Sequence, residues 1–126
     1  MTRRIIDATF RPGMDPHKTP LSRDLKKLSR DPQIQKVAAI RLQKIIEEYA
    51  ARPPENPLKM PRIEPLQGTN GLIQARLAYR TMQFRLVFDV QGQYIRMLTA
   101  FAKKTQETPP LVIDRAHDRQ QSANES

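Results

Sequence analysis

The chain has 126 residues, the length of one domain, and its 38% hydrophobic and 28% charged residues are typical of a small folded protein with a polar surface. It contains no cysteine, which excludes disulfides, thiolate catalysis and cysteine-based zinc sites. Its net charge of +9 favours RNA, DNA or an acidic protein as partner, and the lack of any membrane-length apolar segment or apolar signal segment predicts a soluble, cytoplasmic protein that binds no membrane.

The N-terminal half predicts a short strand followed by two helices. A β-favouring run from Ile5 to Phe10 predicts the strand, and the segment RPGMDPHKTP after it predicts a loop. Thr19 before Pro20, and Asp31 before Pro32, each have the cap-and-proline pattern that begins a helix. The second helix has an apolar stripe, so we expect a helical hairpin that covers one side of a sheet. The stripe consists of Ile34, Ala38, Leu42, Ile45 and Tyr49.

The C-terminal half predicts three strands after a proline-rich connection over residues 53–71 that should be irregular. Apolar and polar residues alternate over 73–79, over 84–90 and again over 95–101, and short turns separate these segments. They therefore predict an antiparallel meander. In the third segment the alternation places four residues on one face, namely Ile95, Met97, Thr99 and Phe101.

The last element is a short helix that begins at Thr108 and Pro109, with Ile113 and Ala116 on its inner face. The small polar residues at the end predict a disordered tail over 120–126, which leaves a single domain over 1–119. The predicted fold class is α+β: an N-terminal strand, a helical hairpin, a three-stranded antiparallel meander and a C-terminal helix.

Basic residues on the predicted meander form the candidate site. Arg76 and Arg85 lie on the polar faces of adjacent strands and can share one surface of the sheet, where a phosphate would separate their charges. Alternatively, Asp89 or Glu64 neutralises one of them, or solvent screens both. Lys103 and Lys104 end the next strand, and because neighbouring strand residues point to opposite sides, only one of them can join the arginines.

Other kinds of catalytic site have little sequence support. Neither His17 nor His117 has a metal-ligand spacing, and we interpret both as non-catalytic. The four glycines form no phosphate-binding loop, and the strands carry no close pair of carboxylates. An enzyme built on this chain would therefore use Arg and Lys, and we expect neither a metal nor a cofactor.

Four short motifs resemble the phage-derived HigB-like toxins of the RelE/ParE superfamily. They are GLIQAR (Gly71–Arg76), FRLVF (Phe84–Phe88), FAKKTQETP (Phe101–Pro109) and IDRA (Ile113–Ala116). The chain departs from the family pattern at four positions, where Ile73 replaces an aromatic residue, Gln74 a glutamate, Ala75 a leucine and Glu107 a lysine. Losing the glutamate removes a possible partner for the arginines.

The resemblance implies a RelE-like fold and the toxin of a type II toxin–antitoxin pair. Such a toxin is a metal-independent endoribonuclease that cleaves messenger RNA on the translating ribosome and is silenced by a cognate HigA-like DNA-binding antitoxin. It implies Arg76, Arg85, Lys103 and Lys104 as catalytic residues. We predict the following RNA contacts: Lys59, Arg62, Tyr79, Arg80, Tyr94 and Arg96.

Two questions stay open at this point. A lysine, Tyr79, Tyr94 or a ribosomal group could accept the proton, since Arg is a poor acceptor. Two other functions also fit: a non-catalytic protein of the same fold that inhibits a protein target such as gyrase, or a simple nucleic-acid-binding domain.

Overall fold

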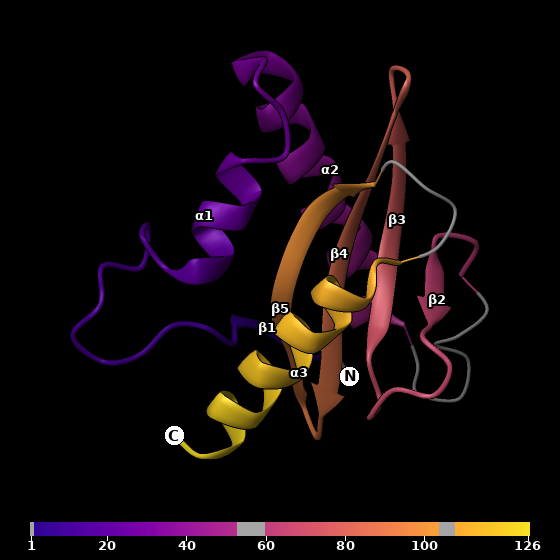
Figure 1. The fold of residues 1–126 in the computed structure, drawn as a ribbon. Helices are drawn as coiled ribbons and strands as arrows, with labels where there is room; N and C mark the ends of the chain where they lie inside the picture. The colour runs from indigo at the N-terminus through magenta and orange to yellow at the C-terminus, as the bar shows by residue number, and fades with distance from the viewer. Residues whose placement is uncertain (1, 53–59, 104–107) are drawn as a thin grey trace.

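The computed structural model describes residues 2–52, 60–103 and 108–126, in which one mixed sheet is packed between helices (Figure 1). The α+β class is confirmed, and the expected elements occur in the expected order, with one additional strand, β2 (Ile63–Pro65), between the second helix and the meander. In chain order the elements are β1 (Arg4–Asp7), α1 (Pro20–Lys26), α2 (Pro32–Ala51), β2 (Ile63–Pro65), β3 (Ile73–Tyr79), β4 (Met82–Gln91), β5 (Tyr94–Lys103) and α3 (Pro110–Asn124).

The sheet has five strands in the order β1-β5-β4-β3-β2. β3, β4 and β5 form the predicted antiparallel meander, and β1 lies parallel to β5 at one edge. β2 was not predicted, because its prolines indicated an irregular connection. It forms an edge strand because Ile63 is buried in the core and residues 63–65 pair with β3, and an edge strand tolerates Pro65.

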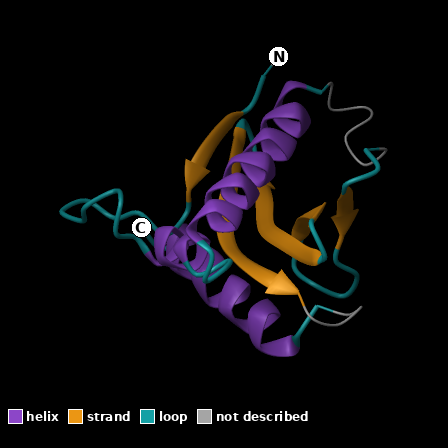
Figure 2. Cartoon of the chain, turned by 90° about the horizontal axis from the view of Figure 1, so that it is seen from above, coloured by secondary structure: helices purple, strands orange, loops and turns teal. Residues whose placement is uncertain are grey.

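Helices cover both faces of the sheet. α1 and α2 pack on one face around Phe84, Leu86 and Phe88, and α3 packs on the other around Val87 and Leu98 (Figure 2). Most of the apolar stripe predicted for α2 is buried, with only Ile34 partly exposed. None of the described helices is both long and apolar enough to cross a membrane.

Both predicted helix starts in the N-terminal half are confirmed. The Thr19 hydroxyl accepts a hydrogen bond from the Ser22 N–H (3.1 Å), and the Asp31 carboxylate accepts from the Gln33 N–H (2.9 Å). The two caps differ in burial. Thr19 is fully buried and also donates to the Asp7 carboxylate (2.6 Å), so it ties α1 to the end of β1, whereas Asp31 is exposed.

The start and end of α3 differ from the prediction. Pro109 is the N-cap and provides no side-chain hydrogen bond, while the Thr108 hydroxyl donates to Gln74 Oε1 (3.1 Å). The helix continues to Asn124, so the tail predicted over 120–126 is helical for most of its length. Gln120 is buried and Ala123 packs against the sheet, so the end of α3 gains contacts that its small polar residues did not indicate.

A β-bulge in β5 changes the face on which its last residues lie. Val87 pairs with Thr99 and Phe88 with Met97, so Leu98 is an extra residue in β5. The prediction that Thr99 and Phe101 share a face with Ile95 and Met97 is therefore wrong, because Thr99 pairs with Val87 of the α3 side. Ile95 and Met97 face α2, whereas Phe101 packs on the α3 side.

A buried ion pair joins β4, β5 and α3. Arg96 donates two hydrogen bonds to the Asp89 carboxylate, from Nε (2.9 Å) and Nη2 (2.7 Å), and Asp89 also accepts from Gln120 Nε2 (3.0 Å). Both members of the pair are buried. The hydrogen bond that Arg96 donates to Asp89 raises the pKa of Arg96, against the effect of burial. Gln120 also donates to the Asn70 carbonyl, so the network extends to the turn before β3.

Removing one charge of this pair should destabilise the fold strongly. Asp89→Ala leaves Arg96 buried without its partner, and we expect a loss of about 3–5 kcal/mol in the free energy of unfolding. Urea titration followed by circular dichroism measures this. The exposed pair formed by Glu64 and Arg76 is the matched control, and Glu64→Gln should cost less than about 1 kcal/mol. Equal effects would contradict the structural role of Asp89.

The two helix caps should differ in their contribution to stability. Asp31→Ala removes an exposed cap and should cost about 1 kcal/mol. Thr19→Ala removes a cap and also the hydrogen bond to Asp7 Oδ2, while Thr9 continues to donate to Asp7 Oδ1, so it should cost about 2 kcal/mol or more. The same urea titrations compare the two variants, and an equal loss would mean that the bond from Thr19 to Asp7 contributes nothing.

Candidate functional site

The two predicted arginines face each other across neighbouring strands. Arg76 of β3 and Arg85 of β4 are direct register partners, which places their Cα atoms about 5 Å apart and their side chains on the same face. This is the α3 face of the sheet. The two side chains line a pocket of about 210 Å³, which we call the arginine pocket. Its lining residues are Pro61, Arg62, Arg76, Ala78, Gln83 and Arg85.

Arg85 is buried with part of its hydrogen-bonding capacity unused. Only 6% of the residue is exposed. Its Nη1 donates to the Phe84 carbonyl (3.0 Å) and to Gln83 Oε1 (3.3 Å), but its Nε is buried without a partner. Burial lowers the pKa of Arg85, the nearby charge of Arg76 lowers it further, and Glu64 acts in the opposite direction. Arginine stays charged at neutral pH, so this side chain is a desolvated cation that an anion would stabilise.

Arg76 is the more exposed member of the pair and has weak protein partners. Its Nη2 donates to the Pro61 carbonyl (2.8 Å), and its Nη1 lies 3.7 Å from a Glu64 carboxylate oxygen. The Arg76 and Glu64 side chains are 43% and 48% exposed. Exposed ion pairs of this length contribute about 0–1 kcal/mol, so a stronger anion can compete for Arg76. The alternative in which Glu64 partly neutralises an arginine therefore applies to Arg76, whereas Asp89 pairs with Arg96.

A chain of hydrogen bonds holds Glu64 next to the arginines. Gln74, which is 2% exposed, accepts from the Thr108 hydroxyl (3.1 Å) and donates from Nε2 to the Glu64 carboxylate (3.0 Å). Gln74 stands where the resemblance has a glutamate. A carboxylate is nevertheless present, because β2 pairs with β3 and brings Glu64 beside Gln74.

Of the two predicted lysines, Lys103 shares the arginine face. It is the register partner of Gln83, which borders Arg85 on the same face of β4. This placement follows from the bulge at Leu98, since strict alternation from Met97 would have turned Lys103 to the α2 side. Lys104 lies outside the described residues.

The predicted RNA contacts are divided between different surfaces. Arg62 is exposed and lines the arginine pocket. Tyr79 lies on the α2 face, where the guanidinium carbons of Arg41 and Arg80 are 4.7 and 5.7 Å from its ring centroid. Arg80 is in the two-residue turn between β3 and β4 with φ at 60°. Tyr79 and Arg80 therefore do not join the arginine pocket.

Tyr94 and Arg96 are also separate from the pocket. Tyr94 starts β5, seven residues before the partner of Arg85, which places it about 20 Å along the strand. Arg96 is not a surface RNA contact, because its guanidinium is buried on Asp89. The sequence could not distinguish it from an exposed strand arginine. Lys59 lies outside the described residues.

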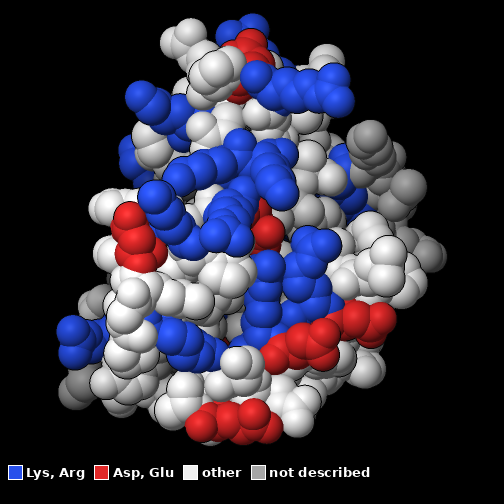
Figure 3. All heavy atoms as spheres, turned by 60° about the vertical axis from the view of Figure 1, so that its left-hand side comes forward, with Lys and Arg blue, Asp and Glu red and all other residues white. Residues whose placement is uncertain are grey.

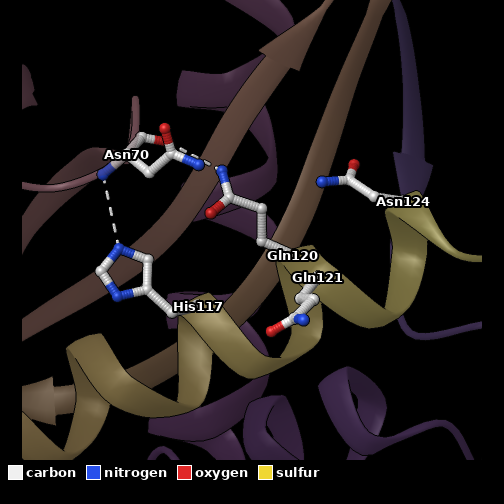
Figure 4. A pocket seen from close by; sticks show the side chains of 5 residues that line it. All are labelled: Asn70, His117, Gln120, Gln121 and Asn124. Atoms are coloured by element: carbon white, nitrogen blue, oxygen red, sulfur yellow. Dashed lines mark hydrogen bonds between the residues drawn. The ribbon is translucent and has the colours of Figure 1, made fainter.

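A second pocket lies at the other end of α3 and contains His117. Its volume is about 330 Å³, and it is lined by Asn70, His117, Gln120, Gln121 and Asn124 (Figure 4). The Asn70 N–H donates to His117 Nε2 (3.4 Å), and Gln120 bonds to the Asn70 carbonyl. The polar groups of Asn70, His117 and Gln120 therefore form hydrogen bonds mainly with one another. Within the described ranges, no three His, Asp or Glu side chains gather as metal ligands do.

Sequence reasoning missed the roles of Gln74, Thr108 and Pro61. Glu64 was considered only as a neutralising charge, because β2 was not predicted. The one available signal was the pair Ile63 and Glu64, an apolar residue followed by a polar one, which is too short to indicate a strand.

Comparison with known proteins identifies a family. A family model described as phage-derived protein Gp49-like (DUF891) matches residues 23–121, which include α2 and all four strands from β2 to β5. No curated protein matches the chain. The match covers most of the chain and contains every residue of the arginine pocket. The chain therefore belongs to the phage-derived Gp49-like family, a toxin-like family in toxin–antitoxin systems.

Proposed function

We propose that the chain is the HigB-like toxin of a type II toxin–antitoxin pair and cleaves messenger RNA on the translating ribosome without a metal ion. One observation carries the proposal: Arg76 and Arg85 face each other in a pocket, and Arg85 is buried with its Nε unpartnered. Membership of a toxin-like family supports the toxin role. A HigA-like antitoxin would silence the activity.

RNA supplies its own nucleophile, so the protein needs only to manage charge and protons. In the proposed step the 2′-oxygen forms a bond to the adjacent phosphorus while the bond to the 5′-oxygen breaks. The 2′-hydroxyl proton passes to a protein base, and the leaving 5′-oxygen takes a proton from water. The products are a 2′,3′-cyclic phosphate and a 5′-hydroxyl end.

The arginines would stabilise the charge that develops on the phosphate oxygens. Fixed donors in a water-poor site stabilise such charge more than water does, because they need no reorganisation during the reaction. Arg85 is held by the Phe84 carbonyl and Gln83, and Arg76 by the Pro61 carbonyl. Lys103 on the same face adds positive charge.

We assign the base to Glu64. Its carboxylate lies 3.7 Å from Arg76 Nη1 and is oriented by Gln74. Half of the side chain is exposed, so a substrate can reach it. Tyr79 lies on the opposite face of the sheet and Tyr94 at the far end of β5, which makes both less suitable.

Loss of either arginine should slow cleavage. For Arg76→Ala, and for Arg85→Lys, which keeps the buried charge but loses the fork of donors, we expect a decrease of about 100-fold or more in the rate of ribosome-dependent messenger RNA cleavage. Primer extension on RNA from a reconstituted translation reaction measures it. Lys44→Ala and Arg52→Ala are the controls, because both remove exposed charges from the α2 region.

Thermal unfolding of each variant separates lost chemistry from lost folding. Unchanged cleavage by a folded double variant of Arg76 and Arg85 would refute the assignment. Growth arrest by the wild-type chain with messenger RNA intact would instead favour a protein target such as gyrase. RNA binding without growth arrest would favour a simple nucleic-acid-binding domain.

Glu64→Gln should separate RNA binding from cleavage. The amide keeps the shape of the side chain but cannot accept the 2′-hydroxyl proton, so cleavage should fall by about 100-fold or more while affinity for the ribosome is kept. Single-turnover cleavage and ribosome co-sedimentation measure the two quantities. Glu47→Gln on the exposed side of α2 is the control. A rate within a few-fold of the wild type would exclude Glu64 as the base.

A further inference from the structure

The α1 helix and its flanks form a basic surface that the arginine pocket does not use. Five basic residues between positions 18 and 30 are exposed, and we call this set the α1 surface. It consists of Lys18, Arg23, Lys26, Lys27 and Arg30. Seen from the side where α1 comes forward, Lys and Arg side chains cover much of the middle of this face, with smaller groups of Asp and Glu between and around them (Figure 3).

The only acidic residue of this segment is turned away from the surface. The Asp24 carboxylate accepts hydrogen bonds from the Thr99 hydroxyl (2.7 Å) and from Arg119 Nη1, and its side chain is 13% exposed. Its charge is thus neutralised by α3. The five exposed cations outnumber the two exposed carboxylates that flank the segment, Asp15 and Asp31, so the surface keeps a net positive charge that an anion would offset.

The α1 surface lies beside the strand that borders the arginine pocket. β1 pairs only with the first four residues of β5, and α1 contacts β5 beyond this point through Asp24 and Thr99. Thr99 is two residues from Phe101, the register partner of Arg85. A helix diameter of about 10 Å and a strand spacing of about 4.8 Å place the α1 surface on the order of 15 Å from Arg85.

The composition of the α1 surface favours nucleic acid over protein. Protein interfaces have an apolar core, but none of the large hydrophobic residues exposed in the described structure lies within residues 18–30. A surface of long cationic side chains suits the phosphate backbone, where affinity comes from released counterions and needs no apolar contact.

We propose that the α1 surface is a second RNA-binding site, which holds the phosphate backbone of a structured RNA while the arginine pocket holds the scissile phosphate. The assignment of RNA as partner rests on the proposed function. The site contacts backbone and not bases, so it contributes affinity without sequence preference.

The test removes two exposed charges and leaves the α1 fold intact. The variant R23Q/K27Q keeps Asp24, and it keeps Lys26, whose ammonium donates to the His17 carbonyl. The control K44Q/R52Q removes the same charge from the α2 region. The probe is a fluorescein-labelled 20-nucleotide RNA hairpin with 2′-O-methyl groups, which cannot be cleaved by attack of the 2′-oxygen. Fluorescence anisotropy gives its affinity between 50 and 200 mM salt.

For R23Q/K27Q we expect weaker binding and a slope of log affinity against log salt that is smaller by about 1.4 to 1.8 units, since each lost phosphate contact removes about 0.7 to 0.9. The control should keep the wild-type slope, and a change of one base pair in the hairpin should have no effect. Equal slopes for the two variants, or unchanged binding, would overturn the proposal, and binding to poly-glutamate in preference to the hairpin would assign an acidic protein instead. Because the hairpin reports binding alone, failure of the proposed cleavage would appear separately, as intact messenger RNA in the translation reaction.

Discussion

The buried ion pair between Asp89 and Arg96 is the interaction on which the arrangement of the sheet depends. A charged pair is costly to bury and is tolerated only when its geometry and remaining hydrogen bonds are satisfied. Here Asp89 receives two bonds from Arg96 and one from Gln120, so β4, β5 and α3 are held in one relative position. α3 thereby covers one end of the sheet face and leaves the other end open to the arginine pocket.

The same face contains two buried arginines with opposite properties. Arg96 has a carboxylate partner that raises its pKa, whereas the pKa of Arg85 is lowered by burial and by Arg76. Arg85 and Arg96 are buried to a similar degree, and they differ in that Arg96 is bonded to a buried carboxylate, Asp89. The satisfied arginine stabilises the fold, and the unsatisfied one has a charge that an anion can use. This contrast separates a structural cation from a candidate binding group without reference to any relative.

Local sequence patterns predicted the parts of the fold that local physics determines. The caps at Thr19 and Asp31, the stripe of α2 and the alternation of β3 and β4 depend on near neighbours, so the sequence was sufficient for them. It also placed Arg76 and Arg85 on one surface. β2, the burial of Arg96 and the link from Thr108 through Gln74 to Glu64 depend on contacts distant in sequence, which no local pattern contains. The prolines near β2 predicted an irregular connection in place of a strand, and the polar residues over 120–126 predicted a disordered tail in place of the end of α3.

The extra residue at Leu98 determines which chemistry the end of β5 presents to solvent. Every residue after it is shifted by one position relative to the pleat, so Phe101 and Lys103 lie on the α3 side and Ala100 and Ala102 on the α2 side. If Leu98 took part in regular alternation and formed no bulge, the two sets would be exchanged, placing a lysine over the apolar core and two small residues beside Arg85. A single extra residue in a strand can therefore determine whether the surface beside Arg85 carries the charge of Lys103 or the uncharged side chains of Ala100 and Ala102.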